Sequence, residues 1–354
     1  MFQKGFKEFF LENILDFLWR QWSALGVAGG ARTEDVWVID PEALLVFSLE
    51  MARYEPRLFD EVLDWLVVNG KWIDIQRLRG IIKSKKEETK RLMSAVACYT
   101  SHEAKTYQRK WRALAQLNGA DSTTQEETLF KTKDGKPYPK PREVLSIFHS
   151  YGFLREEFSL RKMSKSLLVT PGSTLRFLLR ALFGIGSRSE CILYLLTHEA
   201  GHPTEVADAV GISVKGTRDA LIELAESGLV LIRIKGKRKI EYWLSQKRWW
   251  EFLSGMNFEE MKVPMWLDWI SLYSALMNVW EVLQEVEKTK SDYMRSSRLR
   301  EAMDTISIEF SKSRLDLPPI PGSSVRPEKY EEEFKGFITK VLGTRESKKE
   351  GWYR

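Results

Sequence analysis

The segment HEAGH at residues 198–202 carries metal-binding residue types at a recognisable spacing. On a helix, His198 and His202 would share one face, where two imidazoles bind zinc while Glu199 acts as general base in a zinc metallopeptidase. Pro203 follows directly and disfavours helical geometry at His202. Neither of the other two histidines nor any acidic residue is marked as a third ligand. A zinc metallopeptidase with His198 and His202 as ligands is a remote alternative, and we expect no metal and no cofactor.

Gly186 and Ser187 suggest a second catalytic hypothesis, because nucleotidyltransferases begin with Gly-Ser followed by a carboxylate pair that holds magnesium. No Asp-x-Asp or Asp-x-Glu follows within about 20 residues, so the magnesium chemistry has no ligands. No G-x-S-x-G nucleophile elbow occurs either. We therefore expect that the chain is not an enzyme.

Basic side chains form two groups that could bind a polyanion. Lys215 and Arg218 lie near the start of an expected helix, and KGKRK at 235–239 lies between two expected strands. Arginine can donate two hydrogen bonds to guanine, while lysine neutralises phosphate. The candidate DNA-binding residues are Ser213, Lys215, Thr217, Arg218, Lys235, Lys237, Arg238 and Lys239.

The segment TEVADAVGISV at 204–214 positions the first group. Val206, Ala207 and Val210 recur at helical spacing, which predicts a short helix with one apolar face. Gly211 suits the positive φ that ends a helix, and Ser213 is a good N-cap for the next one. The pattern predicts a helix, a tight turn and a second helix at 213–226, whose first residues would face the major groove.

Two expected strands position the second basic group. LVLIRI at 229–234 and IEYWLS at 240–245 are rich in β-branched and aromatic residues, with the basic loop between them. Such a hairpin would form a wing that contacts phosphate or the minor groove. The order helix, helix, turn, helix and basic hairpin is typical of a winged helix-turn-helix.

From about residue 187 to 250 the chain resembles the winged-helix transcriptional regulators of the MarR and ArsR kind. The matching residues are TEVADAVGIS, the run to ESGLV, and the hairpin that ends in EYWLS. The resemblance implies binding of double-stranded DNA, usually as a homodimer. Gly216 departs from the pattern, because a side chain is usual there and glycine lowers helix propensity by about 1 kcal/mol.

Composition and charge are compatible with this reading. The length of 354 residues predicts two or three domains, and the 43% of apolar residues is enough for each to have a hydrophobic core. The formal net charge of +6 is compatible with a polyanion partner. Cys98 and Cys191 lie in apolar helical patterns and are expected to be buried free thiols. Charged residues interrupt the apolar N-terminal helix, which argues against a membrane span or signal segment. We expect a cytoplasmic protein.

The sequence predicts a mainly α, multi-domain helical protein. Residues 1–117 form an expected N-terminal helical domain. Its segment 41–83 could be a second, degenerate helix-turn-helix, and the alternative is that its basic last part, Arg77 included, is a solvated face of the helical domain. Residues 118–141 are the expected linker because Gly, Pro, Thr and Asp cluster there. Residues 142–254 contain the winged helix-turn-helix, and 255–354 form a helical, possible dimerisation region with a wide apolar face at 264–286.

The leading hypothesis is a sequence-specific DNA-binding transcriptional regulator. The alternative is a protein-interaction module, for example the antitoxin or defence-system partner of a toxin, because winged helices also dock proteins. The 13 tryptophans and the long flanking regions favour keeping this alternative.

Overall fold

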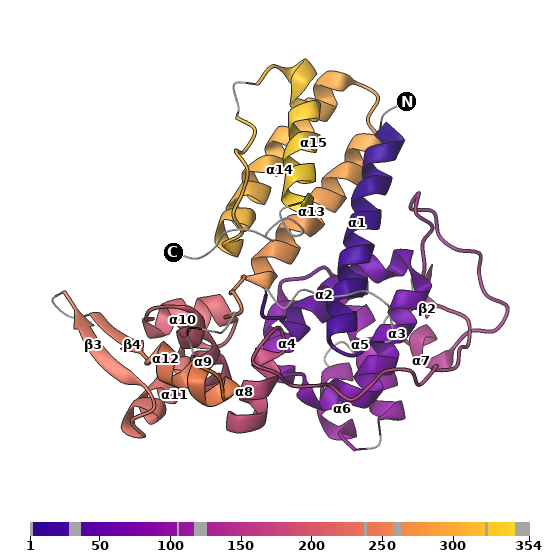
Figure 1. The fold of residues 1–354 in the computed structure, drawn as a ribbon. Helices are drawn as coiled ribbons and strands as arrows, with labels where there is room; N and C mark the ends of the chain where they lie inside the picture. The colour runs from indigo at the N-terminus through magenta and orange to yellow at the C-terminus, as the bar shows by residue number, and fades with distance from the viewer. Residues whose placement is uncertain are drawn as a thin grey trace. The chain divides into compact units, whose positions relative to one another are not determined.

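The computed structural model describes residues 3–27, 37–104, 106–116, 126–236, 239–257, 259, 263–322 and 325–343. The chain is mainly helical, and its described residues form only two two-stranded sheets (Figure 1). Contacts divide it into two compact units, Leu18–Trp266 and a unit that joins Met1–Phe17 to Leu267–Arg354. The predicted mainly α, multi-domain fold class is therefore confirmed. Within the described residues, no helix has the length and apolar composition to cross a membrane.

The unit that joins the two ends of the chain contains the first part of α1 (Gln3–Ala24), α13 (Trp269–Glu287), α14 (Asp292–Ser313) and α15 (Pro327–Gly343). The ring of Phe10 stacks on Trp280 with 6.3 Å between centroids, and Phe17 stacks on Trp269 at 6.0 Å. Trp269 and Trp280 are each 2% exposed. The apolar face predicted for a dimer is thus covered by helices of the same chain.

The larger unit begins with the last part of α1, from Leu18, which five helices follow. They are α2 (Pro41–Met51), α3 (Pro56–Asn69), α4 (Ile75–Lys83), α5 (Glu87–Glu103) and α6 (Gln108–Ala115), with 3-10 turns η1 (Ala52–Tyr54) and η2 (Gly70–Trp72). Asp40 caps α2 by accepting the Ala43 N–H, and Asp74 caps α4. Helices therefore occupy the predicted degenerate helix-turn-helix at 41–83. Its basic part departs from the expected solvated face at Arg77 of α4, which is only 2% exposed, whereas Lys83 and Lys86 are exposed as expected.

Residues 126–174 pack against these helices. Strand β1 (Glu127–Thr128) pairs in parallel with β2 (Phe153–Leu154), and the short helix α7 (Ser146–His149) lies between them in sequence. The irregular segment 155–174 is here called the strap, and its residues 155–167 are hydrogen-bonded to side chains of α3. Asp64 of α3 accepts the N–H groups of Met163 and Ser164, each at 2.9 Å.

Hydrogen bonds tie parts of the expected linker and of the expected 142–254 domain to the N-terminal helices. Arg53 donates to the Leu129 carbonyl at 2.7 Å, so the described part of the expected 118–141 linker is anchored to the N-terminal helices. The strap is likewise hydrogen-bonded to α3, through Met163, Ser164 and Leu167. The first residues of the expected linker, up to 125, lie outside the described part of the chain.

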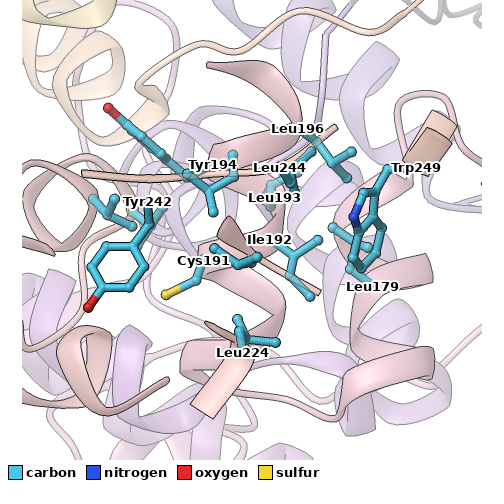
Figure 2. Packing of buried hydrophobic residues seen from close by; sticks show 14 of the residues in the cluster. Leu179, Cys191, Ile192, Leu193, Tyr194, Leu196, Leu224, Tyr242, Leu244 and Trp249 are labelled. Atoms are coloured by element: carbon cyan, nitrogen blue, oxygen red, sulfur yellow. The ribbon is translucent and has the colours of Figure 1, made fainter. Parts of the chain in front are cut away.

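The rest of the larger unit, here called the helix–hairpin region, spans residues 175–254. It contains α8 (Leu175–Phe183), α9 (Ser187–Thr197), α10 (Pro203–Val210), α11 (Val214–Glu226), β3 (Leu231–Lys235), β4 (Lys239–Trp243) and α12 (Gln246–Ser254). Its core packs Ile192, Leu224 and Trp249 from three helices with Tyr242 and Leu244 (Figure 2). Cys191 is a buried free thiol whose pKa burial raises to about 12, and Cys98 is a half-buried free thiol.

A cluster of six charged residues, here called the buried ion network, joins the N-terminal helices to the helix–hairpin region. Arg180 of α8 contacts Glu42 of α2 at 2.7 Å and Glu190 of α9 at 2.8 Å. Arg176 of α8 contacts Asp40 at 2.6 Å. Arg77 completes the set through Glu42 at 2.8 Å and through Asp40. Each of the six is at most 4% exposed, so every charge depends on its neighbours rather than on water.

Candidate nucleic-acid interface

The turn between α10 and α11 has the geometry that its sequence predicts. Gly211 ends α10 in the left-handed region, with φ of 70° and ψ of 41°. The Ser213 Oγ caps α11 by accepting the Gly216 N–H at 3.1 Å. Local hydrogen bonds thus place the start of α11 at the surface of the helix–hairpin region.

The first turn of α11 presents some of the predicted DNA-binding residues and hides one. Ser213, Lys215 and Arg218 are exposed. Thr217 is fully buried, and its hydroxyl donates to the Ser213 carbonyl at 3.0 Å. Thr217 therefore cannot contact a base, and its prediction as a DNA-binding residue is wrong. Its side chain instead packs α11 onto the core.

Close packing accounts for the glycine at position 216. A Cβ built there would lie 2.9 Å from the Ser187 Oγ at the start of α9 and 3.1 Å from the Ser213 Oγ. The glycine therefore lets α11 approach α9 closely, and a side chain at this position would need the Ser187 hydroxyl to move.

The hairpin forms where the sequence predicts it. Strands β3 and β4 are antiparallel, with Arg233 opposite Glu241 and Lys235 opposite Lys239. Lys239 contacts Glu205 of α10 at 2.7 Å, and this hydrogen bond raises the pKa of Lys239 while lowering that of Glu205. Lys237 and Arg238 lie outside the described residues.

Positive charge on the helix pair is confined to the start of α11. The exposed basic residues of α10 and α11 are Lys215 and Arg218. The exposed acidic residues of the same helices are Glu205, Asp208, Asp219, Glu223 and Glu226. Arg188 of α9 offsets Glu223 at 2.6 Å. On these two helices a polyanion would therefore meet a favourable charge at the N-terminal end of α11 and not along their whole length.

The HEAGH segment lacks the geometry of a zinc peptidase. Helix α9 ends at Thr197, and His198 is extended, with φ of −134° and ψ of 153°. Its ring stacks on Tyr194 with 3.8 Å between centroids. His202 instead caps α10 through the Thr204 N–H. The two imidazoles are thus not on one helix, and no group of three potential ligands occurs among the described residues.

The turn is also held from outside the helix–hairpin region. The Arg77 Nε donates to the carbonyl of Val210, the last residue of α10, at 2.6 Å. The buried ion network fixes the same guanidinium from its other side. Sequence reasoning missed this anchor, although Arg176 and Arg180 interrupt the apolar run TLRFLLRALFG at a spacing of four and so mark charges on a buried helix.

No protein-family model, curated protein or solved structure matches the chain. The resemblance to winged-helix regulators therefore stays a prediction drawn from residues 187–250.

Proposed function

We propose that the chain is a cytoplasmic transcriptional regulator that binds double-stranded DNA through the start of α11 and the β3–β4 hairpin. The main support is the exposure of Lys215 and Arg218, neither of which forms an ion pair with any described residue. A helix N-terminus attracts phosphate, because its free N–H groups and dipole favour negative charge.

The exposed residues have separate roles in this proposal. Arg218 is the expected reader of a guanine edge, while Lys215 binds the neighbouring phosphates. Ser213 holds the helix start through its cap, and the basic loop at 235–239 fixes the register on the DNA backbone.

The experiment is selection of fragmented genomic DNA on the purified full chain, repeated across a salt series. Sequence-specific binding should enrich one motif, and a palindromic motif would support the proposed homodimer. Retention that falls steeply with salt and carries no motif would show only a basic surface. A lack of retention at low salt would overturn the proposal.

The exposed apolar residues of the hairpin favour a second candidate function, docking of a partner protein. In this case the chain would be, for example, an antitoxin that binds its toxin. Ile232, Ile234 and Ile240 are 54%, 73% and 45% exposed. Ile234 lies directly opposite Ile240, so the two side chains share a face. A wing that contacts only phosphate has no need of this apolar pair.

A matched pair of substitutions tests the docking candidate. Ile234→Ser should release a co-purifying partner without changing DNA retention. Ile308→Ser is the control, because Ile308 of α14 is also exposed, at 55%, but lies outside the hairpin. A partner that both variants retain equally would exclude the apolar pair as its docking site.

A further inference from the structure

Strand β3 has one edge paired with β4 and a second edge without a neighbouring strand in the described part of the chain. On β4, Tyr242 exchanges two hydrogen bonds with Gly201, each at 2.9 Å, so the N–H and C=O of Tyr242 point away from β3. Ile232 lies directly opposite Tyr242. Because hydrogen-bonded and non-hydrogen-bonded pairs alternate along an antiparallel ladder, the N–H and C=O groups of Ile232 and Ile234 point away from β4.

These outward-pointing groups of Ile232 and Ile234 are here called the β3 edge. None of them has a hydrogen-bond partner among the described residues. The two residues are 54% and 73% exposed, so another chain can reach their backbone. An unpaired strand edge is a template on which an extended segment can add as a further strand.

The charge of the hairpin determines which added strand it favours. Glu241 is the acidic residue of the hairpin sequence 231–243, whose basic residues are Arg233, Lys235, Lys237, Arg238 and Lys239. Glu199 and Glu205 also pair with the hairpin, but the basic residues still outnumber the acidic ones. The β3 edge therefore favours a negatively charged strand. A second copy of the chain would instead bring two basic hairpins together, which repulsion between like charges opposes.

The two faces of β3 differ in chemistry. Successive side chains of a strand point to opposite faces, so Ile232 and Ile234 share one face and Arg233 lies on the other. Residues directly opposite each other on neighbouring strands share a face. An added strand that alternates apolar and acidic residues would therefore place its apolar side chains beside the isoleucines and its carboxylates beside the arginine.

We propose that the β3 edge binds an extended segment of a partner protein in which apolar and acidic residues alternate, as a third strand of the sheet. Backbone hydrogen bonds to Ile232 and Ile234 provide affinity, and the alternating side chains provide specificity. This binding mode rests on the docking candidate above and names the chemistry of its partner. It does not depend on binding of DNA.

The probe is the fluorescein-labelled peptide Glu-Val-Glu-Val-Glu-Val-Glu, whose binding to the full chain is followed by fluorescence anisotropy. Lys-Val-Lys-Val-Lys-Val-Lys keeps the alternation and reverses the charge. Glu-Glu-Glu-Glu-Val-Val-Val keeps the composition and removes the alternation. Both control peptides should bind about tenfold more weakly than the probe, because each loses the favourable cross-strand pairs.

Two proline variants test the position of the added strand. Ile234→Pro removes an outward N–H of β3 and leaves the ladder to β4 intact, because that N–H does not point to β4. Ile240→Pro is the matched control, since Ile240 lies opposite Ile234 and its N–H also points outward, but at the other edge of the sheet. Probe binding should weaken by about tenfold in Ile234→Pro and stay within about twofold of the original in Ile240→Pro. Circular dichroism of each variant checks the fold.

Three results would overturn the proposal: no binding of the probe, equal binding of the three peptides, or equal effects of the two proline variants. If the probe does not bind and Ile234→Pro dissociates a dimer of the chain in sedimentation, the occupant of the β3 edge is a second copy. If Ile234→Ser releases a co-purifying partner while the probe does not bind, docking at the apolar pair stands and strand addition is wrong.

Discussion

Glu42 is the residue on which the buried ion network depends most. It accepts from Arg180 at 2.7 and 2.9 Å, from Arg77 at 2.8 Å and from the Asp74 N–H at 2.7 Å. Burial by itself would raise the pKa of Glu42, but the Arg180 and Arg77 guanidiniums outweigh burial and hold that pKa below its ordinary value of 4.5. The carboxylate is therefore ionised in the fold and neutralises two buried arginines.

Glu42→Gln should destabilise the chain by about 3–5 kcal/mol, because it leaves uncompensated positive charge in the interior. Denaturation by urea, followed by tryptophan fluorescence, measures the loss. Glu226→Gln is the matched control, since Glu226 is exposed on α11. Equal unfolding midpoints for the two variants would show that the network is not needed for stability.

Asp40 gives the same network a pH dependence. Its burial favours protonation, but Arg176 and Arg77 more than compensate and hold the pKa of Asp40 well below its ordinary value of 3.8. A depressed folded pKa adds stability above the ordinary value, and that stability is lost as pH falls through the folded pKa. Unfolding midpoints should therefore fall between about pH 5 and about pH 2. The fall in unfolding midpoint should be smaller in Asp40→Asn. If the plots of midpoint against pH for the variant and the original chain run parallel, Asp40 is not the source of the pH dependence.

Arg218→Ala tests the proposed base contact. Loss of a bidentate guanine contact should cost about 1–3 kcal/mol of DNA affinity and relax the motif at one position. Fluorescence anisotropy with the selected motif and single-base variants measures both effects. Arg326→Ala, at an exposed arginine in the unit of the chain ends, should leave affinity unchanged. A uniform loss across all sequences would instead assign Arg218 to phosphate.

At the scale of single elements, local chemistry made the fold predictable. Asp40, Asp74 and Ser213 begin helices because their side chains accept N–H groups from the following turn. Thr217 was wrongly predicted to bind DNA, because the direction of a helical side chain depends on how the helix packs as well as on its position in the first turn. A signal was present, since Thr217 shares the spacing of Leu221 and Leu224, both buried.

Gly216→Ala is expected to lower stability, although alanine favours a helix by about 1 kcal/mol. The new methyl would lie 3.1 Å from the Ser213 Oγ and so disturb a cap worth about 1 kcal/mol. It would also press on the Ser187 Oγ at 2.9 Å. Thermal unfolding measures the change. A Ser187→Ala background should relieve part of it, and a stabilised single variant would contradict the close approach.

At the scale of the whole molecule, pairings between distant segments escaped prediction. Arg180 meets Glu42 from 138 residues away, and Arg155 meets Asp60 from 95 residues away. No local pattern specifies such partners, so the contact of the strap with α3 was not predicted. The same limitation applies to α13, whose apolar face is recognised from sequence but is covered in part by α1, from the other end of the chain, as well as by the following helix α14.

Trp280→Ala distinguishes two explanations for the apolar face of α13: burial within its own chain, or burial in an interface between two copies. Trp280 packs against Phe10 and lies 5.7 Å from the Lys7 ammonium, within its own unit. Truncation should therefore cost about 3–5 kcal/mol, as for a core tryptophan. Sedimentation under native conditions should show the same oligomeric state as the original chain, because the removed contacts are intramolecular. If the variant instead dissociates a dimer without loss of stability, the tryptophan lies in an interface between copies, and α1 must leave α13 when the chain associates.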